Sequence, residues 1–175
     1  LESFYRRHPG AVISSSINKY IYINTSRKFD GNIRISYSKT ENCKSLEEIQ
    51  HPLVRESLKK CEIYNSIEIS SMADIPATGT GLGSSSAFTV GLLKALYAYK
   101  GLTKTNQFIA ESACDIEINK CNECLGKQDQ YGAAIGGFNV FRFNSSGEVS
   151  IEKCEISKDR VEIFKNNLLI LYSGN

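Results

Sequence analysis

Residues 76–87 read PATGTGLGSSSA, and this stretch carries most of the information about what the chain is built to do. Glycines 79, 81 and 83 precede serines 84–86, and an apolar helical pattern begins at Phe88. Glycine permits positive φ and close approach to a ligand, so successive N–H groups can point into one concavity. The positive end of the following helix adds to these donors. The stretch therefore predicts an anion-binding loop that suits nucleotide phosphates.

Three better-known glycine-rich patterns do not fit these letters. A P-loop requires a lysine after its second glycine, and no lysine follows here. The dinucleotide fingerprint requires a glycine where Ser84 or Ser86 stands. A nucleophile elbow requires a glycine two residues after the serine, and none of the three serines has one. The remaining alternative is an ordinary loop that caps the helix through Ser84.

The rest of the chain predicts an α+β domain. Strand patterns occupy residues 11–15, 20–25, 33–38, 67–69, 137–143, 149–151 and 167–172. Ser45 and Glu48 form a capping box, from which a helix is expected to continue past Pro52 to Cys61. Two further helices are expected, one from Ser84 to Lys100 ending at Gly101, and one from Thr103 or Thr105 to about Lys120. This order predicts a mixed sheet with helices packed on one face.

Composition narrows the class of protein. The chain has 175 residues, of which 41% are apolar, and this is enough for the core of a single domain. The balance of 21 basic and 19 acidic residues gives no case for binding nucleic acid or a membrane. The sequence shows no apolar run of membrane-spanning length and no signal peptide pattern. Composition therefore gives no reason to expect a nucleic-acid or membrane partner.

The six cysteines do not have the spacing of a compact secreted framework, which favours a reducing cytoplasm. Cys121 and Cys124 form a CxxC pair, but no second CxxC or histidine pair stands nearby to complete a zinc site. Two thiols near a helix end are the simpler interpretation of this pair.

Two acidic residues after the glycine-rich stretch are candidates for chemistry. Glu117 shares a helix face with three small residues (Ala110, Ala113 and Cys114), so its carboxylate needs a partner such as a divalent cation. An ion pair with Lys120 one turn later is the alternative, and the helix pattern by itself favours it. Asp129 falls in GKQDQYGAAIGG, where we expect a loop between two glycines; in isolation it would be a turn residue.

Pro76, a short spacer and GLGSSS (81–86) resemble the second motif of the GHMP sugar and metabolite kinases. The resemblance is narrower to the D-glycero-D-manno-heptose 7-phosphate kinases of that superfamily. It rests on HPGAVISSSINKYIYI (8–23), IPATGTGLGSSSAFTVGLLKA (75–95) and KQDQYGAAIGGFNVFRF (127–143). The resemblance implies the amino-terminal domain of such a kinase, with a fold like domain 2 of ribosomal protein S5.

The resemblance also implies site residues. ATP phosphates would be bound by Pro76, Gly79, Thr80, Gly81, Leu82, Gly83, Ser84, Ser85 and Ser86. Ser85 and Glu117 would coordinate Mg²⁺, with Ser84 or Ser86 able to replace the Ser85 hydroxyl. Asp129 would accept or orient the proton of the acceptor hydroxyl, with Lys127 as an electrostatic helper. Arg6, Arg7 and Lys19 could contact an acceptor phosphate or be solvated surface charges.

The implied reaction is ATP-dependent phosphoryl transfer to a sugar phosphate, with D-glycero-D-manno-heptose 7-phosphate as the first choice of acceptor. A kinase of a free sugar such as fucose, and a non-catalytic nucleotide or sugar sensor on the same fold, are the alternatives. The chain starts at Leu1 rather than Met, and its last strand pattern is followed by three residues. We therefore expect residues 1–175 to be a fragment, with the family's opening strand and its carboxy-terminal domain lying outside it.

Overall fold

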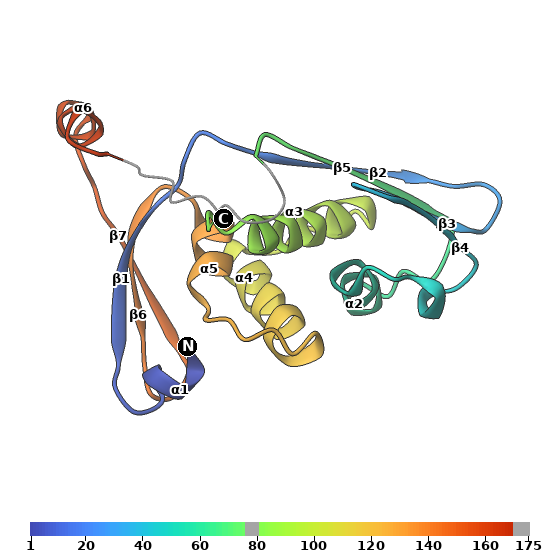
Figure 1. Cartoon of the computed structure of the whole chain (residues 1–175), viewed down its shortest axis with the longest axis horizontal. Coiled ribbons are helices and arrows are strands. Elements are labelled where there is room, and N and C mark those ends of the chain that lie inside the picture. Colours follow the sequence, from blue (N-terminus) through green and yellow to red (C-terminus); the bar gives the residue numbers. More distant parts are fainter. Residues whose placement is uncertain (76–80, 170–175) are drawn as a thin grey trace.

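The computed structural model describes residues 1–75 and 81–169 of the chain. Its strands form two separate sheets, with helices packed against each of them (Figure 1). The first sheet has the order β2-β5-β3-β4 and the second has the order β1-β6-β7. The α+β class and the mixed sheet covered by helices on one face are confirmed, and the structure adds the second sheet.

The four-stranded sheet delivers the chain to the glycine-rich stretch. Its members are β2 (Ile21–Arg27), β3 (Ile33–Ser36), β4 (Thr40–Cys43) and β5 (Ile67–Ala73). Strand β5 runs antiparallel to β2 and parallel to β3. The parallel register sets Ile33 beside Ile67 and Ile35 beside Ile69, and all four side chains are at most 1% exposed. These cross-strand pairs anchor the sheet on its helix-covered face.

The three-stranded sheet is antiparallel throughout. It consists of β1 (Gly10–Ser15), β6 (Phe138–Phe143) and β7 (Val149–Lys153). Phe141 of β6 is fully buried, and its ring meets the ring of Tyr131 on helix α5 (Gln128–Ile135) at a centroid distance of 6.0 Å. This contact packs α5 on the inner face of the second sheet.

Helix α3 (Ser84–Tyr99) is the central helix. It packs against β2, α2 (Pro52–Lys60), α4 (Asn106–Cys114) and α5. Its residues Leu92, Leu93 and Leu96 are completely buried. A six-residue π-helix, η2 (Asp115–Lys120), continues α4 without a break. Two peripheral helices, α1 (Glu2–Tyr5) and α6 (Lys158–Asn166), and a single 3-10 turn, η1 (Leu46–Glu48), complete the described elements.

Several predicted boundaries are confirmed. Thr105 caps α4 by accepting a hydrogen bond from the Phe108 N–H at 3.2 Å. Gly101 follows α3 with φ of +70°, and the Leu102 N–H bonds the Tyr97 carbonyl at 2.9 Å, as expected of a helix end closed by glycine. Strand β5, at Ile67–Ala73, includes the strand expected at 67–69 and leads into the glycine-rich stretch, as expected.

Other predictions were wrong at element ends. The capping box does not form, because Glu48 accepts from the Lys44 N–H and Ser45 makes no side-chain cap. The helix begins instead at Pro52, whose missing N–H costs nothing at a first helical position. The strand expected at 33–38 ends at Ser36, and β4 follows a short bend. Of the strand expected at 167–172, residues 167–169 are not in a strand, and 170–172 lie outside the described residues.

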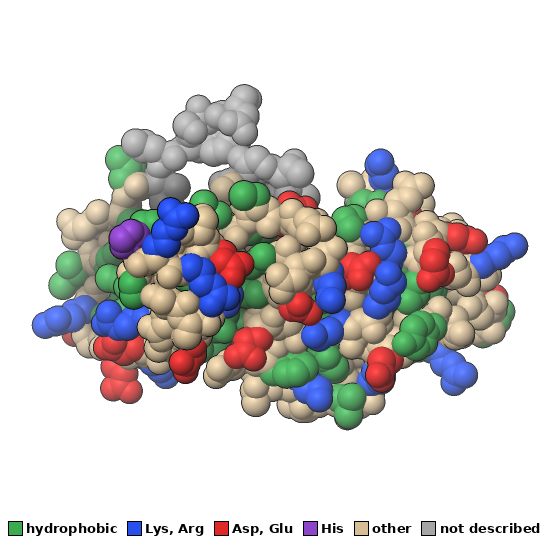
Figure 2. All heavy atoms as spheres, turned by 90° about the horizontal axis from the view of Figure 1, so that it is seen from below, with side chains coloured by type: hydrophobic (Ala, Val, Ile, Leu, Met, Phe, Trp, Pro, Cys, Tyr) green, Lys and Arg blue, Asp and Glu red, His purple; other side chains and the backbone are tan. Residues whose placement is uncertain are grey.

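The surface carries both signs of charge. Figure 2 shows Lys and Arg side chains interspersed with Asp and Glu across one face, with no large area of a single sign. Among helices of the described ranges 1–75 and 81–169, none combines the length and the hydropathy needed to cross a bilayer.

Substituting Leu92→Ala in the central helix should lower the free energy of unfolding by about 3 kcal/mol, because the side chain is fully buried and the cavity can close only in part. Urea denaturation followed by circular dichroism measures this loss. Leu168→Ala, at a side chain that is 52% exposed, is the matched control and should change stability by no more than about 0.5 kcal/mol. Equal losses in the two variants would contradict the placement of α3 at the centre of the core.

Candidate active site

The glycine-rich stretch ends in a tight turn onto α3. Pro76, Gly79 and Thr80, which were expected to bind phosphate, lie outside the described residues. Gly81 and Gly83 have φ of +63° and +71°, a region that glycine enters without steric cost. Gly83 is the N-cap of α3 and Ser84 is its first helical residue, so the helix is not capped by Ser84. The N-terminus of α3, where backbone N–H groups lack intrahelical acceptors, therefore follows directly on a glycine turn.

Asp129 lies directly against this turn. A Cβ added to Gly83 would stand 3.3 Å from the Asp129 Cβ and 3.5 Å from its Oδ2. The expected loop is wrong here, because Asp129 is in the first turn of α5, where a carboxylate favours a helix N-terminus. Its side chain is exposed. The absence of a side chain at residue 83 thus brings a carboxylate next to the candidate anion site.

Glu117, in the π-helix η2, contacts the first turn of α3 that follows the glycine-rich turn. Its side chain is 0% exposed. Its Oε2 atom accepts from Ser86 Oγ at 2.9 Å and from Gln130 Nε2 at 2.7 Å, whereas its Oε1 atom has no hydrogen-bond partner among the described residues. The alternative of a semi-exposed Glu117 paired with Lys120 is wrong, since the carboxylate is buried and is held by Ser86 and Gln130.

Burial raises the pKa of Glu117 above its ordinary value. The hydroxyls of Thr89 and Ser86 and the amide of Gln130 lower this pKa, and the nearby negative charge of Asp129 raises it. Desolvation is the largest of these effects and sets the direction. The arrangement is that of a carboxylate kept out of water with one oxygen left without a partner.

The three serines occupy different environments. Ser86 is 2% exposed and contacts Glu117, whereas Ser85 is exposed and its carbonyl accepts from Thr89 Oγ1 at 3.1 Å. Ser84 lies in the wall of a pocket together with Gly81, Leu82 and Gly83. Of the serines considered as metal ligands, Ser86 is therefore the one in direct contact with Glu117.

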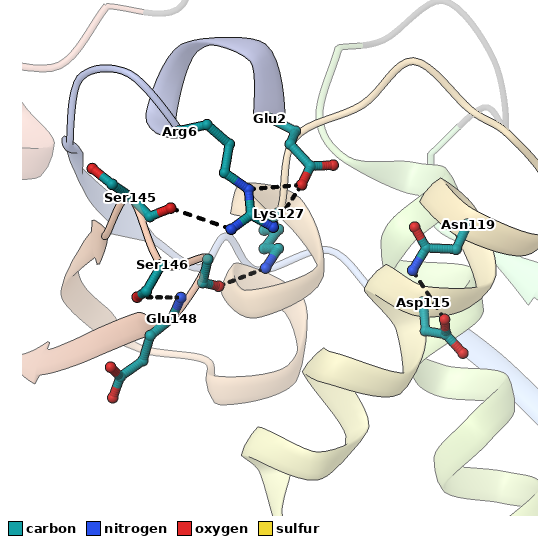
Figure 3. A network of polar contacts seen from close by, with 9 residues as sticks. Glu2, Arg6, Asp115, Asn119, Lys127, Ser145, Ser146 and Glu148 are labelled. Carbon is teal, nitrogen blue, oxygen red and sulfur yellow. Dashed lines mark hydrogen bonds and ion pairs between the residues drawn. The ribbon is translucent and has the colours of Figure 1, made fainter.

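Lys127 is engaged by residues outside the glycine-rich turn. Its Nζ donates to the Gly147 carbonyl at 2.7 Å and lies 5.5 Å from the centre of the Tyr5 ring. Figure 3 shows Lys127 and Arg6 directed at the turn between β6 and β7, where Arg6 also donates to the Ser145 carbonyl at 3.2 Å. Arg6 pairs with Glu2 as well, so its charge is already engaged.

Two pockets meet at Asp129. The larger, about 540 Å³, is lined by residues 81–84 of the glycine-rich turn and by Lys19 and Lys94. The smaller, about 330 Å³, is lined by Lys127, Ser86 and the aromatic side chains Phe4, Tyr5 and Phe143. Gln128 and Asp129 belong to the walls of both pockets. A group at Asp129 can therefore reach a ligand in either pocket.

The cysteines take no part in this site. All six thiols are unpaired in the structure, with Cys121 half-buried and Cys124 exposed. Among residues 1–75 and 81–169, no group of three or more His, Cys, Asp or Glu side chains is placed to hold a metal ion. A site with a single carboxylate remains compatible with Mg²⁺, which is commonly held by one or two carboxylates and substrate phosphates.

Residues 48–137, just over half of the chain, match the family model described as the GHMP kinases N terminal domain. The chain belongs to the GHMP kinase family. The matched segment includes the glycine-rich turn, Glu117 and Asp129, which are the parts of this GHMP kinase chain that the fold brings together.

Similar proteins agree with this assignment. A curated D-glycero-alpha-D-manno-heptose 7-phosphate kinase of Campylobacter jejuni is 29% identical over 165 residues, covering 86% of this chain and 48% of the relative. A solved D-glycero-D-manno-heptose 1-phosphate kinase from Bacteroides thetaiotaomicron is 26% identical with a TM-score of 0.82, covering 89% of this chain and 54% of the other.

Lactococcus lactis galactokinase shares the fold at 17% identity and a TM-score of 0.68, covering 85% of this chain and 42% of the galactokinase. This chain spans about half the length of the relatives that it matches.

Sequence reasoning gave Gln130 no role, although its side chain is completely buried against Glu117. The sequence contains only a weak indication of such a role. Gln130 directly follows the candidate catalytic aspartate, but the segment was expected to be a loop, whereas it is the start of a helix. Helical spacing, once assigned from residue 128, would have set Asp129 and Gln130 on different faces.

The pH dependence of the free energy of unfolding should show that the Glu117 carboxylate is buried. The folded chain holds the Glu117 proton more tightly than the unfolded chain does. The stabilisation that this gives is therefore complete below the ordinary pKa of 4.5 and is lost as pH rises through the raised pKa of the folded chain. Glu117→Gln removes this dependence. Urea midpoints measured across pH 4 to 8 should therefore show wild type losing stability relative to Glu117→Gln as pH increases.

The matched control is Glu123→Gln, at an exposed position just after η2, which should follow the pH dependence of wild type. Parallel curves for wild type and Glu117→Gln would show that the carboxylate is solvated.

Proposed function

We propose that this chain provides the nucleotide-binding and catalytic residues of a sugar-phosphate kinase that transfers the γ-phosphoryl group of ATP to a hydroxyl of D-glycero-D-manno-heptose 7-phosphate. One observation carries the proposal: Glu117 and Asp129, from two different helical segments, both lie at the glycine-rich turn, one through Ser86 and the other against Gly83. Phosphoryl transfer depends mainly on positioning and charge neutralisation, and this arrangement suits both.

The larger pocket would receive the nucleotide. Gly81, Leu82, Gly83 and Ser84 line it, so backbone N–H groups and the N-terminus of α3 would bind the ATP phosphates, joined by Pro76, Gly79 and Thr80 of the same motif. The exposed hydroxyl of Ser85 and the buried hydroxyl of Ser86 stand at the start of the same helix.

The donor set at Glu117 fits magnesium. An unpartnered carboxylate oxygen with no access to water is costly, and a hard divalent cation is the ligand that offsets this cost. Glu117 would hold Mg²⁺ through Oε1, together with the hydroxyl of Ser85 or that of Ser86. When bound, the ion would neutralise charge between the β- and γ-phosphates.

Asp129 would orient the acceptor hydroxyl and accept its proton. It stands in the wall shared by both pockets, so an acceptor in the smaller pocket would face phosphates in the larger one. Lys127, which also lines the smaller pocket, would supply positive charge for a phosphorylated acceptor. The heptose 7-phosphate assignment rests on the curated relative, and a cytoplasmic location follows from such a substrate.

Asp129→Asn should lower kcat at least about 100-fold while ATP binding is retained, because the amide keeps the shape of the side chain but cannot take a proton. The measurement is coupled ADP release by the natural full-length protein with heptose 7-phosphate, heptose 1-phosphate and fucose. Asp159→Asn, at an exposed aspartate in the first turn of α6, is the matched control and should leave turnover unchanged. Turnover near wild type in Asp129→Asn would remove this residue from the mechanism.

Higher turnover with fucose than with either heptose phosphate would assign a different acceptor and leave the kinase assignment in place. ATP binding without turnover of any acceptor would favour a sensor on the same fold.

Gly83→Ala should weaken ATP binding, because a Cβ at residue 83 would press on Asp129 and distort the turn. Gly101→Ala is a close control: its φ is +70° and an added Cβ would meet nothing within 4 Å. Both variants should lose about 1–2 kcal/mol of stability from the left-handed backbone. Calorimetric titration with ATP should show weaker binding in Gly83→Ala only. Equal affinities in the two variants would contradict a role of this turn in binding ATP.

A further inference from the structure

Gln130 is a buried polar residue, and a contribution to stability does not explain why an amide is found at this position. Its side chain is 0% exposed, its Nε2 donates to Glu117 Oε2 at 2.7 Å, and its Oε1 has no hydrogen-bond partner among the described residues. A buried amide with an unsatisfied oxygen destabilises a fold, whereas an apolar side chain of similar size would fill the same space without that cost. The single hydrogen bond to Glu117 is therefore what the amide provides.

The bond restricts the Glu117 carboxylate to one orientation. Ser86 on α3 and Gln130 on α5 both donate to Oε2, and neither donates to Oε1. Two donors from two helices leave the carboxylate little freedom to rotate and leave Oε1 as the atom without a partner. Losing the Gln130 donor would leave the 2.9 Å bond from Ser86 and the nearby Thr89 hydroxyl, both on α3, and would remove the restraint that comes from α5.

The same bond also holds α5. Gln130 follows Asp129 in the first turn of this helix, and Asp129 lies against Gly83. An amide that ties this turn to Glu117 in η2 therefore fixes the position of one carboxylate relative to the other. Buried hydrogen bonds of this kind stiffen the residues that they join.

We propose that Gln130 is a positioning residue whose amide orients Glu117 for metal binding and holds Asp129 beside the glycine-rich turn. This inference rests on the proposed function of the site. Residues that support a metal ligand from behind commonly contribute about 10- to 100-fold to metal affinity or activity.

The test is Gln130→Met, which keeps the length of the side chain and removes the donor. Calorimetry with ADP in the presence of Mg²⁺ should show binding weakened about tenfold or more. In the metal-free protein, the backbone amides of residues 132–135, which are bonded within α5, should exchange hydrogen faster, while the urea midpoint stays the same or rises. The matched control is Gln107→Met, which removes an exposed amide bonded to Glu111 Oε1 at 3.0 Å and should change none of these quantities.

A double variant shows whether Gln130 acts through Glu117. In a Glu117→Gln background, adding Gln130→Met should cause no further loss of magnesium-dependent affinity, because the oxygen that it orients is no longer a carboxylate. An additional full tenfold loss would overturn the proposal. Should Gln130→Met fail to fold, Gln130→Asn takes its place, since an amide one methylene shorter cannot reach Glu117.

Wild-type affinity for ADP with Mg²⁺ in either variant at residue 130 would overturn the inference and leave the proposed kinase intact. Failure of the wild-type protein to bind ADP with Mg²⁺ would instead contradict the proposed function. In that case the exchange rates of residues 132–135 still decide whether Gln130 holds α5, and unchanged rates in Gln130→Met would overturn the inference.

Discussion

The carboxylate of Glu117 lies where no water reaches it, and the arrangement of the surrounding helices follows from that constraint. Taking an ionised carboxylate out of water costs several kcal/mol unless hydrogen bonds or a cation compensate. Here the compensation comes from the first turns of two other helices, through Ser86 and Gln130. The start of α3, the π-helix η2 and the start of α5 therefore have to converge on one point, which is also where the glycine-rich turn ends.

The local helix type is part of this convergence. Residues Asp115–Lys120 form a π-helix that continues α4, and π-helical turns in proteins are found frequently at functional sites. A wider turn rotates the following side chains relative to an α-helix of the same sequence. Glu117 sits within this segment, and its main-chain carbonyl accepts from the Glu123 N–H at 2.9 Å beyond the usual helical spacing. The irregular backbone and the buried acid occur together.

Close approach of Asp129 to Gly83 divides the site into two pockets. The pocket on the side of the turn has glycine and serine in its wall, and the other has three aromatic rings and a lysine. In the proposed reaction, the first pocket would bind the nucleotide phosphates and the second the sugar, with the Asp129 carboxylate between them. The fold that supports it is shared with solved proteins as different in sequence as a galactokinase at 17% identity.

Sequence alone determined the glycine-rich turn, the helix after it, the α+β class and the candidate acids, because glycine spacing, helical periodicity and alternation are local properties. It did not determine that Asp129 lies in the first turn of a helix, that a new helix starts at Pro52, or that Ser86 rather than Ser85 contacts Glu117. Nor did it indicate a role for Gln130. These features depend on which side chains meet between segments distant in the sequence, such as Ser86 and Glu117, which are 31 residues apart, and only the packing of the helices brings them together.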